Sequence, residues 1–198
     1  MGLRVGSLLA ALLGLGLLAG LLLYDMRARD AGELSAPLAA IGGPFTLTGT
    51  DGQPFDSESL KGKPHAVFFG FTHCPEVCPT TLNELSVMMG ELGAKADDFR
   101  AVFITVDPER DSPEALKSYM QSFDPRLIAL TGSPEAIAKV AKSFRVYYAK
   151  QPTSDGSYVM DHTSIVFLMN AKGEFTGTLD FEENANTKLA KLKRLVGG

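Results

Sequence analysis

The chain has two cysteines, Cys74 and Cys78, and both lie in the segment FTHCPEVCP at residues 71–79. Their spacing puts the two sulfur atoms one turn apart if the segment is helical, close enough to form a disulfide or to bind one metal ion. Three interpretations are therefore open: a redox-active dithiol, a metal site or a structural disulfide. Two cysteines in 198 residues are too few for a disulfide scaffold, and so short a bridge would restrict the unfolded chain little. A reactive pair is favoured.

A metal site needs a further ligand, and the chain has three histidines. His73 is adjacent to Cys74, so the two side chains are expected to point apart, and His65 lies at the far end of the preceding predicted strand. His162 lies at a loop-to-strand junction, just before the apolar run TSIVFLMN, and could face the motif. From the residues alone it is either a ligand or a structural histidine. Two sulfurs and one imidazole suit Cu(I) or zinc, and a low coordination number favours copper.

Two aspartates near these positions are weaker candidates. Asp161 precedes His162, and neighbouring strand residues point to opposite faces of a sheet, so Asp161 is expected to orient other groups or to serve a turn. Asp107 ends a predicted strand in VDPERD. It is expected to act as an acceptor in the turn before Pro108 rather than as a ligand.

The elements that must position the cysteines follow from the apolar pattern. HAVFFGF at residues 65–71 is a continuous apolar run, which is typical of a strand covered on both faces. TTLNELSVMMGELGAKA at residues 80–96 has apolar residues at helical spacing. A strand therefore passes into a helix through the cysteine motif. The helix dipole and the free N–H groups at that point favour thiolate over thiol.

The remaining pattern predicts an α/β domain. A hairpin is expected at residues 45–55, strands at 100–107, 146–150, 157–161, 163–170 and 174–180, and helices at 112–123, 133–144 and 182–196. Ser112 and Ser133 are the expected N-caps of two helices, and each is followed by proline. Parallel crossovers followed by an antiparallel hairpin give a mixed β-sheet with helices on both faces, which is the plan of a thioredoxin-like fold.

The N-terminal segment is apolar, and residues 5–24 carry no charge. About 20 such residues match the hydrocarbon thickness of a bilayer. No convincing signal-peptidase site follows, so we expect an uncleaved transmembrane helix at residues 1–24, a linker at 25–40 and the thioredoxin-like domain at 41–198. The 23 acidic residues outnumber the 19 basic ones, and no basic cluster is interleaved with aromatics, so nucleic-acid binding is not expected.

Five motifs, in their order and spacing, resemble the SCO/SenC family over about residues 41–196: GFTHCPEVCPTTL, ITVDPERDSPEAL, LTGSPE, RVYYAK and DHTSIVFLMNAKGEF. The resemblance implies a membrane-tethered thioredoxin-like domain. It also implies copper delivery to, or thiol reduction at, the Cu A site in subunit II of cytochrome c oxidase during oxidase assembly. By the same resemblance Cys74, Cys78 and His162 bind the copper ion.

The resemblance also implies a domain that faces the bacterial periplasm or the mitochondrial intermembrane space. No Arg/Ser-rich transit segment precedes the apolar run, so we expect a single-pass protein of the bacterial inner membrane with its soluble domain in the periplasm. The expected partners are subunit II of the oxidase, another periplasmic copper carrier and the membrane itself.

The main interpretation is a copper chaperone that is not an enzyme, and the alternative is a thiol:disulfide oxidoreductase that acts on envelope proteins through the C-x-x-x-C pair. His162 distinguishes them, because a dithiol reductase does not need it. A peroxiredoxin-like peroxidase is disfavoured, since Thr72 has no matching arginine in the motif. The motifs G-x-S-x-G, H-E-x-x-H and the phosphate loop are absent from the sequence.

Overall fold

The structure is a computed structural model, and it describes residue 20 and residues 41–197. Residues Ala40–Gly198 form one compact unit. The transmembrane helix expected at 1–24 and the linker expected at 25–40 lie outside the described residues, apart from Gly20. Within the described residues, no helix is both long enough and apolar enough to span a membrane.

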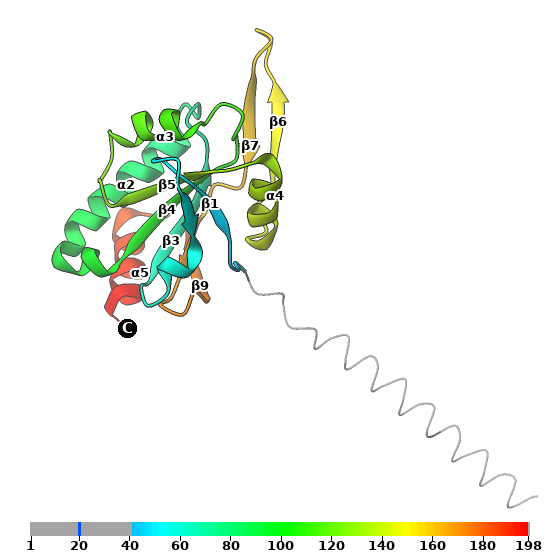
Figure 1. The fold of residues 1–198 in the computed structure, drawn as a ribbon. Coiled ribbons are helices and arrows are strands. Elements are labelled where there is room, and N and C mark those ends of the chain that lie inside the picture. Colours follow the sequence, from blue (N-terminus) through cyan, green and yellow to red (C-terminus); the bar gives the residue numbers. More distant parts are fainter. Residues whose placement is uncertain (1–19, 21–40, 198) are drawn as a thin grey trace, which may run out of the picture. The chain divides into compact units, whose positions relative to one another are not determined.

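The centre of the domain is a seven-stranded mixed sheet with the strand order β2-β1-β5-β4-β3-β8-β9 (Figure 1). Its strands are β1 (Thr46–Gly49), β2 (Pro54–Asp56), β3 (His65–Gly70), β4 (Arg100–Thr105), β5 (Leu127–Thr131), β8 (Val166–Met169) and β9 (Phe175–Leu179). The central strand β3 runs parallel to β4 and antiparallel to β8. The mixed sheet expected from the sequence is confirmed.

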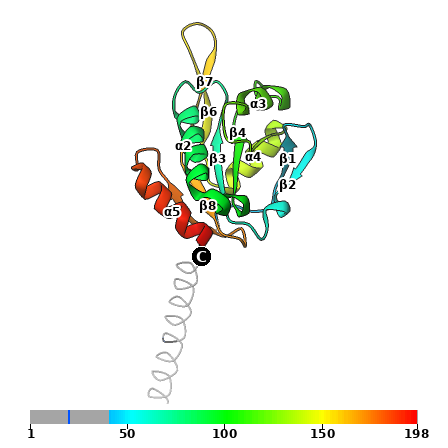
Figure 2. The same cartoon turned by 90° about the vertical axis from the view of Figure 1, so that its left-hand side faces the viewer.

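Helices cover both faces of this sheet. They are α2 (Val77–Leu92), α3 (Pro113–Met120), α4 (Pro134–Ser143) and α5 (Ala185–Gly197), with the short 3-10 helices η1 (Ser57–Leu60) and η2 (Gly93–Asp98). Figure 2 looks onto the face covered by α2, α3 and α5, while α4 lies behind the sheet. The expected N-caps are present, because the hydroxyls of Ser112 and Ser133 each accept a backbone N–H three residues later at 3.2 Å.

Side chains on both faces of β3 are buried, as its apolar run predicts. On one face Phe68 packs against Phe103 of β4, with the ring centroids 5.9 Å apart. On the other face Phe69 packs against Phe144, the C-cap residue that follows α4, and against Phe167 of β8, with centroids 5.4 and 6.2 Å away. Each face of the central strand therefore has its own apolar layer, and the strand is held rigidly from both sides.

Strand β5 is not predicted from the sequence, and the structure corrects the predicted order of elements. Residues Leu127–Thr131 pair with β4 in parallel on one side and with β1 in antiparallel on the other. The run is only five residues long and lies between a turn and the next helix. Its strand conformation depends on partners that are distant in the sequence, which local patterning does not reveal.

A second sheet consists of the antiparallel strands β6 (Tyr148–Pro152) and β7 (Tyr158–His162). This β6–β7 hairpin projects beyond the carboxyl end of β3 (Figures 1 and 2). Because β8 is antiparallel to β3, its first residue Val166 pairs with Phe68 near the end of β3. His162, four residues before Val166, therefore lies at the same edge of the sheet as the cysteine motif.

Candidate metal centre

The cysteine motif lies at the junction of β3 and α2. β3 ends at Gly70 and α2 begins at Val77, so Cys74 lies in the connecting turn and Cys78 in the first turn of the helix. Both thiols are free; Cys78 is fully buried, whereas Cys74 is half-buried. A partner molecule in solution can therefore reach the sulfur of Cys74 more easily than that of Cys78.

Gly70 is required for the position of the buried thiol. A methyl group at this residue would lie 2.8 Å from the Sγ of Cys78 and 2.7 Å from the Cε2 of Phe103. Both distances are far shorter than a normal van der Waals contact. Glycine at the end of β3 therefore provides the space that the Cys78 sulfur occupies.

The sulfur of Cys74 interacts with the start of the helix. It accepts the backbone N–H of Cys78 at 3.4 Å, and the preceding Glu76 provides no side-chain cap. A hydrogen bond from the Cys78 thiol is the main cause that lowers the pKa of Cys74 to about 4, against burial and with smaller help from His162 and the Cys78 N–H. The same contact, together with burial, raises the pKa of Cys78. Cys74 is therefore the thiolate at neutral pH.

His162 completes the group of donors. Its Nε2 lies 3.7 Å from the Sγ of Cys78. Its Nδ1 lies 3.0 Å from the carbonyl oxygen of Thr163, which can only accept, so Nδ1 carries the proton and Nε2 of the neutral ring keeps its lone pair. The ring also packs edge-on against Phe71, with the centroids 5.7 Å apart. These contacts orient a nitrogen lone pair toward the buried thiol.

Two sulfurs and one imidazole nitrogen suit a soft metal ion. Metal–sulfur and metal–nitrogen bonds of about 2.3 and 2.0 Å at an angle of about 120° would separate the two donor atoms by about 3.7 Å. This is the separation observed between Cys78 Sγ and His162 Nε2. In residues 41–197, no group of three or more His, Cys, Asp or Glu side chains is already arranged to hold a metal ion. Binding of an ion therefore requires a rearrangement of these side chains.

The other candidates from the sequence lie elsewhere. The side chain of His73 is exposed, and its Nδ1 lies 3.0 Å from the Oγ1 of Thr72. His65 begins β3, at the opposite end of the strand, and its Nδ1 contacts a backbone carbonyl. Asp161 is exposed, whereas its neighbour His162 is half-buried, as alternation along β7 predicts.

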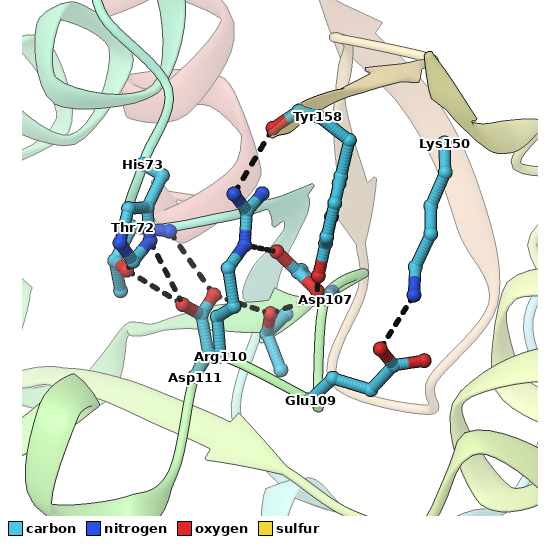
Figure 3. Close-up of polar contacts among 9 residues, drawn as sticks. Thr72, His73, Asp107, Glu109, Arg110, Asp111, Lys150 and Tyr158 are labelled. Atoms are coloured by element: carbon cyan, nitrogen blue, oxygen red, sulfur yellow. Dashed lines mark hydrogen bonds and ion pairs between the residues drawn. The ribbon is translucent and has the colours of Figure 1, made fainter. Parts of the chain in front are cut away.

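Asp107 has a different role from the one expected. Its backbone carbonyl serves the local turn and accepts the N–H groups of Arg110 and Asp111. Its side chain, which is buried, instead accepts hydrogen bonds from Arg110 Nε and from the hydroxyl of Tyr158 on β7, at 2.9 Å for the latter (Figure 3). The carboxylate therefore connects the end of β4 to the β6–β7 hairpin.

Arg110, Asp111 and Tyr158 were not identified from the sequence. The only local signal is the run of charges in DPERD directly after a buried strand, since a charged group there needs a partner if it is buried. Besides Asp107, Arg110 has a partner on the hairpin, Tyr158, which is 48 positions away in the sequence. No spacing rule connects positions that far apart.

A mixed sheet with helices on both faces, and a cysteine pair where the central strand meets a helix, defines a thioredoxin-like domain with a dithiol at the carboxyl edge of the sheet. The family model described as SCO1/SenC matches residues 34–197, and the chain belongs to this family. The resemblance seen in the sequence motifs is thus confirmed.

Relatives with known names agree with this assignment. The chain is 44% identical over 142 residues to Protein SCO1 homolog 1, mitochondrial, of Arabidopsis thaliana; the alignment covers 71% of this chain and 42% of that relative's length. ScoI of Bradyrhizobium japonicum, solved with copper bound, is 50% identical with a TM-score of 0.73, and the match covers 79% of this chain and 99% of that one. BsSco, a member of the Sco family of cytochrome c oxidase assembly proteins with a disulfide switch, is 30% identical with a TM-score of 0.62, covering 81% and 96%.

Proposed function

We propose that this chain binds copper through Cys74, Cys78 and His162, and that during oxidase assembly it delivers copper to, or reduces the cysteines of, the Cu A site in subunit II of cytochrome c oxidase. The observation that carries the proposal is the 3.7 Å approach of His162 Nε2 to Cys78 Sγ, although the two residues are 84 positions apart. Membership of the SCO1/SenC family and the copper-bound structure of a relative support copper as the cargo.

The asymmetry of the site suits a carrier that must both hold and release its ion. Cys78 and His162 are set in place by the packing of β3 and Phe71, so two donors need little rearrangement. Cys74 is half-buried, so it is the donor that solvent and a partner reach first. A ligand from a partner can approach on the Cys74 side and take the ion by exchange of ligands.

We further propose that residues 1–24 tether the domain to the bacterial inner membrane, with the domain in the periplasm, where another copper carrier loads it. The uncharged apolar run of residues 5–24 supports the tether. Fractionation of cells that express the full chain tests this: the protein is expected in the membrane fraction after carbonate washing, and protease added to spheroplasts is expected to digest it. Recovery in the cytosolic fraction contradicts the proposal.

A second candidate function is thiol:disulfide exchange, and the lowered pKa of Cys74 favours it. The Cys74 thiolate attacks a disulfide of a partner and forms a mixed disulfide. Cys78 then gives up its proton and displaces the partner's sulfur, so the partner leaves with two thiols and Cys74 and Cys78 remain as a disulfide. Two electrons pass to the partner, and an external dithiol restores the reduced pair.

Copper titration of the full-length chain, reduced and kept anaerobic, tests the ligand assignment. The wild type is expected to bind one copper ion tightly, and Cys74→Ser, Cys78→Ser and His162→Ala are each expected to lose tight binding. His162→Ala is expected to keep the ability to form the disulfide, which mass spectrometry after mild oxidation measures. His73→Ala is the matched control and is expected to bind like the wild type. Unchanged copper stoichiometry in His162→Ala refutes the assignment.

The same variants separate the two candidate functions. If reduction is the task, His162→Ala reduces a disulfide in a peptide that carries the cysteine pair of subunit II as fast as the wild type does. If copper delivery is the task, transfer to the reduced form of that peptide is lost in His162→Ala. Failure of the wild type to reduce the peptide faster than a free dithiol contradicts the reductase function.

A further inference from the structure

A cluster of three side chains, Asp107, Arg110 and Tyr158, holds the β6–β7 hairpin to the domain (Figure 3). Arg110 donates from Nε to the carboxylate of Asp107 and from Nη1 to the backbone carbonyl of Tyr158 at 3.0 Å. The guanidinium carbon lies 3.8 Å from the centroid of the Tyr158 ring. The hydroxyl of Tyr158 returns to Asp107 at 2.9 Å. We call these three residues the Arg110 cluster.

The loop that carries the Arg110 cluster is also fixed to the cysteine motif. Asp111, whose side chain is fully buried, accepts the N–H and the hydroxyl of Thr72 at 3.0 and 2.5 Å. It also accepts the hydroxyl of Thr105 at the end of β4, at 2.6 Å. Thr72 lies two residues before Cys74. Residues 107–111 therefore contact the segment before the thiols on one side and the hairpin on the other.

The hairpin carries His162 at its base, and the Arg110 cluster holds it farther along. Tyr158, Met160 and His162 point to one face of β7 because side chains alternate along a strand, and all three are at least half-buried. Tyr158 is four residues from His162, or about 13 Å along the strand. Near His162 itself, Arg110 lies 6.0 Å from the centroid of the Phe71 ring, which packs against the imidazole. Because the hairpin is held both at Tyr158 and at His162, its orientation relative to the thiols is fixed.

We propose that Arg110 is a positioning residue for the metal site: through Asp107 and Tyr158 it keeps the β6–β7 hairpin in the direction that places His162 at the two thiols, and it thereby sets how tightly copper is held. This inference rests on the proposed copper-binding function. Arg110 does not bind the ion. It acts on affinity by raising the fraction of molecules in which the imidazole is already in place.

Loss of the Arg110 side chain is expected to weaken copper binding about 10- to 100-fold, the range found when groups that orient metal ligands are removed. Arg110→Lys keeps a positive charge near the buried Asp107, but an ammonium group does not reproduce the fork of the guanidinium. It is expected to fall between wild type and Arg110→Ala. Tyr158→Phe removes one hydrogen bond and keeps the ring, and it is expected to have a smaller effect.

The experiment measures copper affinity by competition with a chelator, on the full-length reduced chain, for wild type, Arg110→Ala, His162→Ala and the double variant. If Arg110 acts through the imidazole, Arg110→Ala weakens binding in the wild-type background and changes it less than about twofold in the His162→Ala background. Arg126→Ala is the matched control. This substitution removes two hydrogen bonds to Asp124, at 2.9 and 2.7 Å. They lie beside the start of β5, at the amino end of the parallel strands, whereas the cysteine motif lies at their carboxyl end. The copper affinity of Arg126→Ala is expected to equal that of wild type.

Hydrogen exchange of the copper-free proteins provides a second measurement. In Arg110→Ala the backbone amides of residues 158–162 are expected to exchange faster than in wild type, while those of β3 exchange at the same rate. Faster exchange in both segments shows a general loss of stability and overturns the positioning role. Absence of a cooperative unfolding transition in both Arg110→Ala and Arg110→Lys does the same.

The outcomes separate this inference from the proposed function. If His162→Ala loses tight binding and both Arg110 variants bind within about twofold of wild type, copper binding stands and the positioning role is wrong. A loss caused by Arg110→Ala that persists in the His162→Ala background also overturns it. If His162→Ala binds copper as the wild type does, the ligand assignment fails, and the inference fails with it.

Discussion

Replacement of Gly70 by alanine tests how tightly β3 holds the buried thiol. The added methyl group would lie 2.8 Å from Cys78 Sγ and 2.7 Å from a ring carbon of Phe103. Cys78 and Phe103 are both fully buried, and because protein interiors are close-packed, a shift of either side chain displaces its neighbours. The methyl group therefore has to displace the sulfur, the ring or the backbone of the central strand.

The expected cost is that of an overpacked core, about 1–3 kcal/mol in the free energy of unfolding. For a domain of this size, about 1 kcal/mol corresponds to about 2–4 °C in Tm, so Tm is expected to fall by about 2–12 °C. Copper affinity is expected to fall as well, because a displaced Cys78 sulfur no longer has the observed separation from His162. The loss of stability does not depend on copper, and it is measured on the reduced, metal-free chain.

The assay is urea or thermal unfolding of the full-length chain, followed by circular dichroism. Gly90→Ala is the matched control: Gly90 lies in α2, and apart from its chain neighbours and the nearby backbone of the same helix, no atom lies within 4 Å of the position of its added methyl group. Alanine in a helix is favoured over glycine by up to about 1 kcal/mol, so this control is expected to be neutral or stabilising. If the free energy of unfolding of Gly70→Ala is within about 0.5 kcal/mol of that of wild type, the Cys78 sulfur does not exclude a side chain at residue 70, and the reasoning is wrong.

Two further predictions concern the same edge of the sheet. Iodoacetamide is expected to modify Cys74 before Cys78, and its reaction rate with Cys74 is expected to rise with pH through about 4, where this thiol loses its proton. Mass spectrometry at several pH values measures the rate. A rate that rises only near pH 8 or 9 contradicts the prediction. Asp111→Ala is expected to lower the free energy of unfolding by at least about 2 kcal/mol, because the donors of half-buried Thr72 and buried Thr105 lose their acceptor. Chemical denaturation measures this change, and a loss below about 1 kcal/mol shows that other groups or water satisfy these donors.

The sequence predicts the elements whose signal is local. The apolar run at residues 65–71 predicts β3, and the Ser-Pro pairs predict the starts of α3 and α4. Both features depend on groups a few residues apart. Strand β5 is missed because its five residues gain their conformation from β1 and β4. Local propensity carries little information about such a strand.

The site shows the same division. The sequence predicts that Cys74 and Cys78 lie between a strand and a helix, and the structure places them there. The prediction that both are reactive agrees with the lowered pKa of Cys74 but not with Cys78, whose contact with Cys74 and burial raise its pKa. Residue patterning alone did not decide whether His162 is a ligand or a structural histidine, because its approach to the thiols depends on β8 running antiparallel to β3. Arg110 gave no signal, because its partner on the hairpin is 48 positions away. Contacts between distant segments are decided by topology, which a single sequence specifies only indirectly.

The length of the β6–β7 hairpin can change at its tip without changing the position of His162 at its base. Its pairing runs from Tyr148 and His162 at the base to Pro152 and Tyr158, and residues 153–157 form the tip. Extra residues inserted at Ser154 or Asp155, both exposed, would leave every pair below them in register. The tip therefore offers a position for a fluorescent reporter, which would move with the histidine while the chemistry at the base stays unaltered.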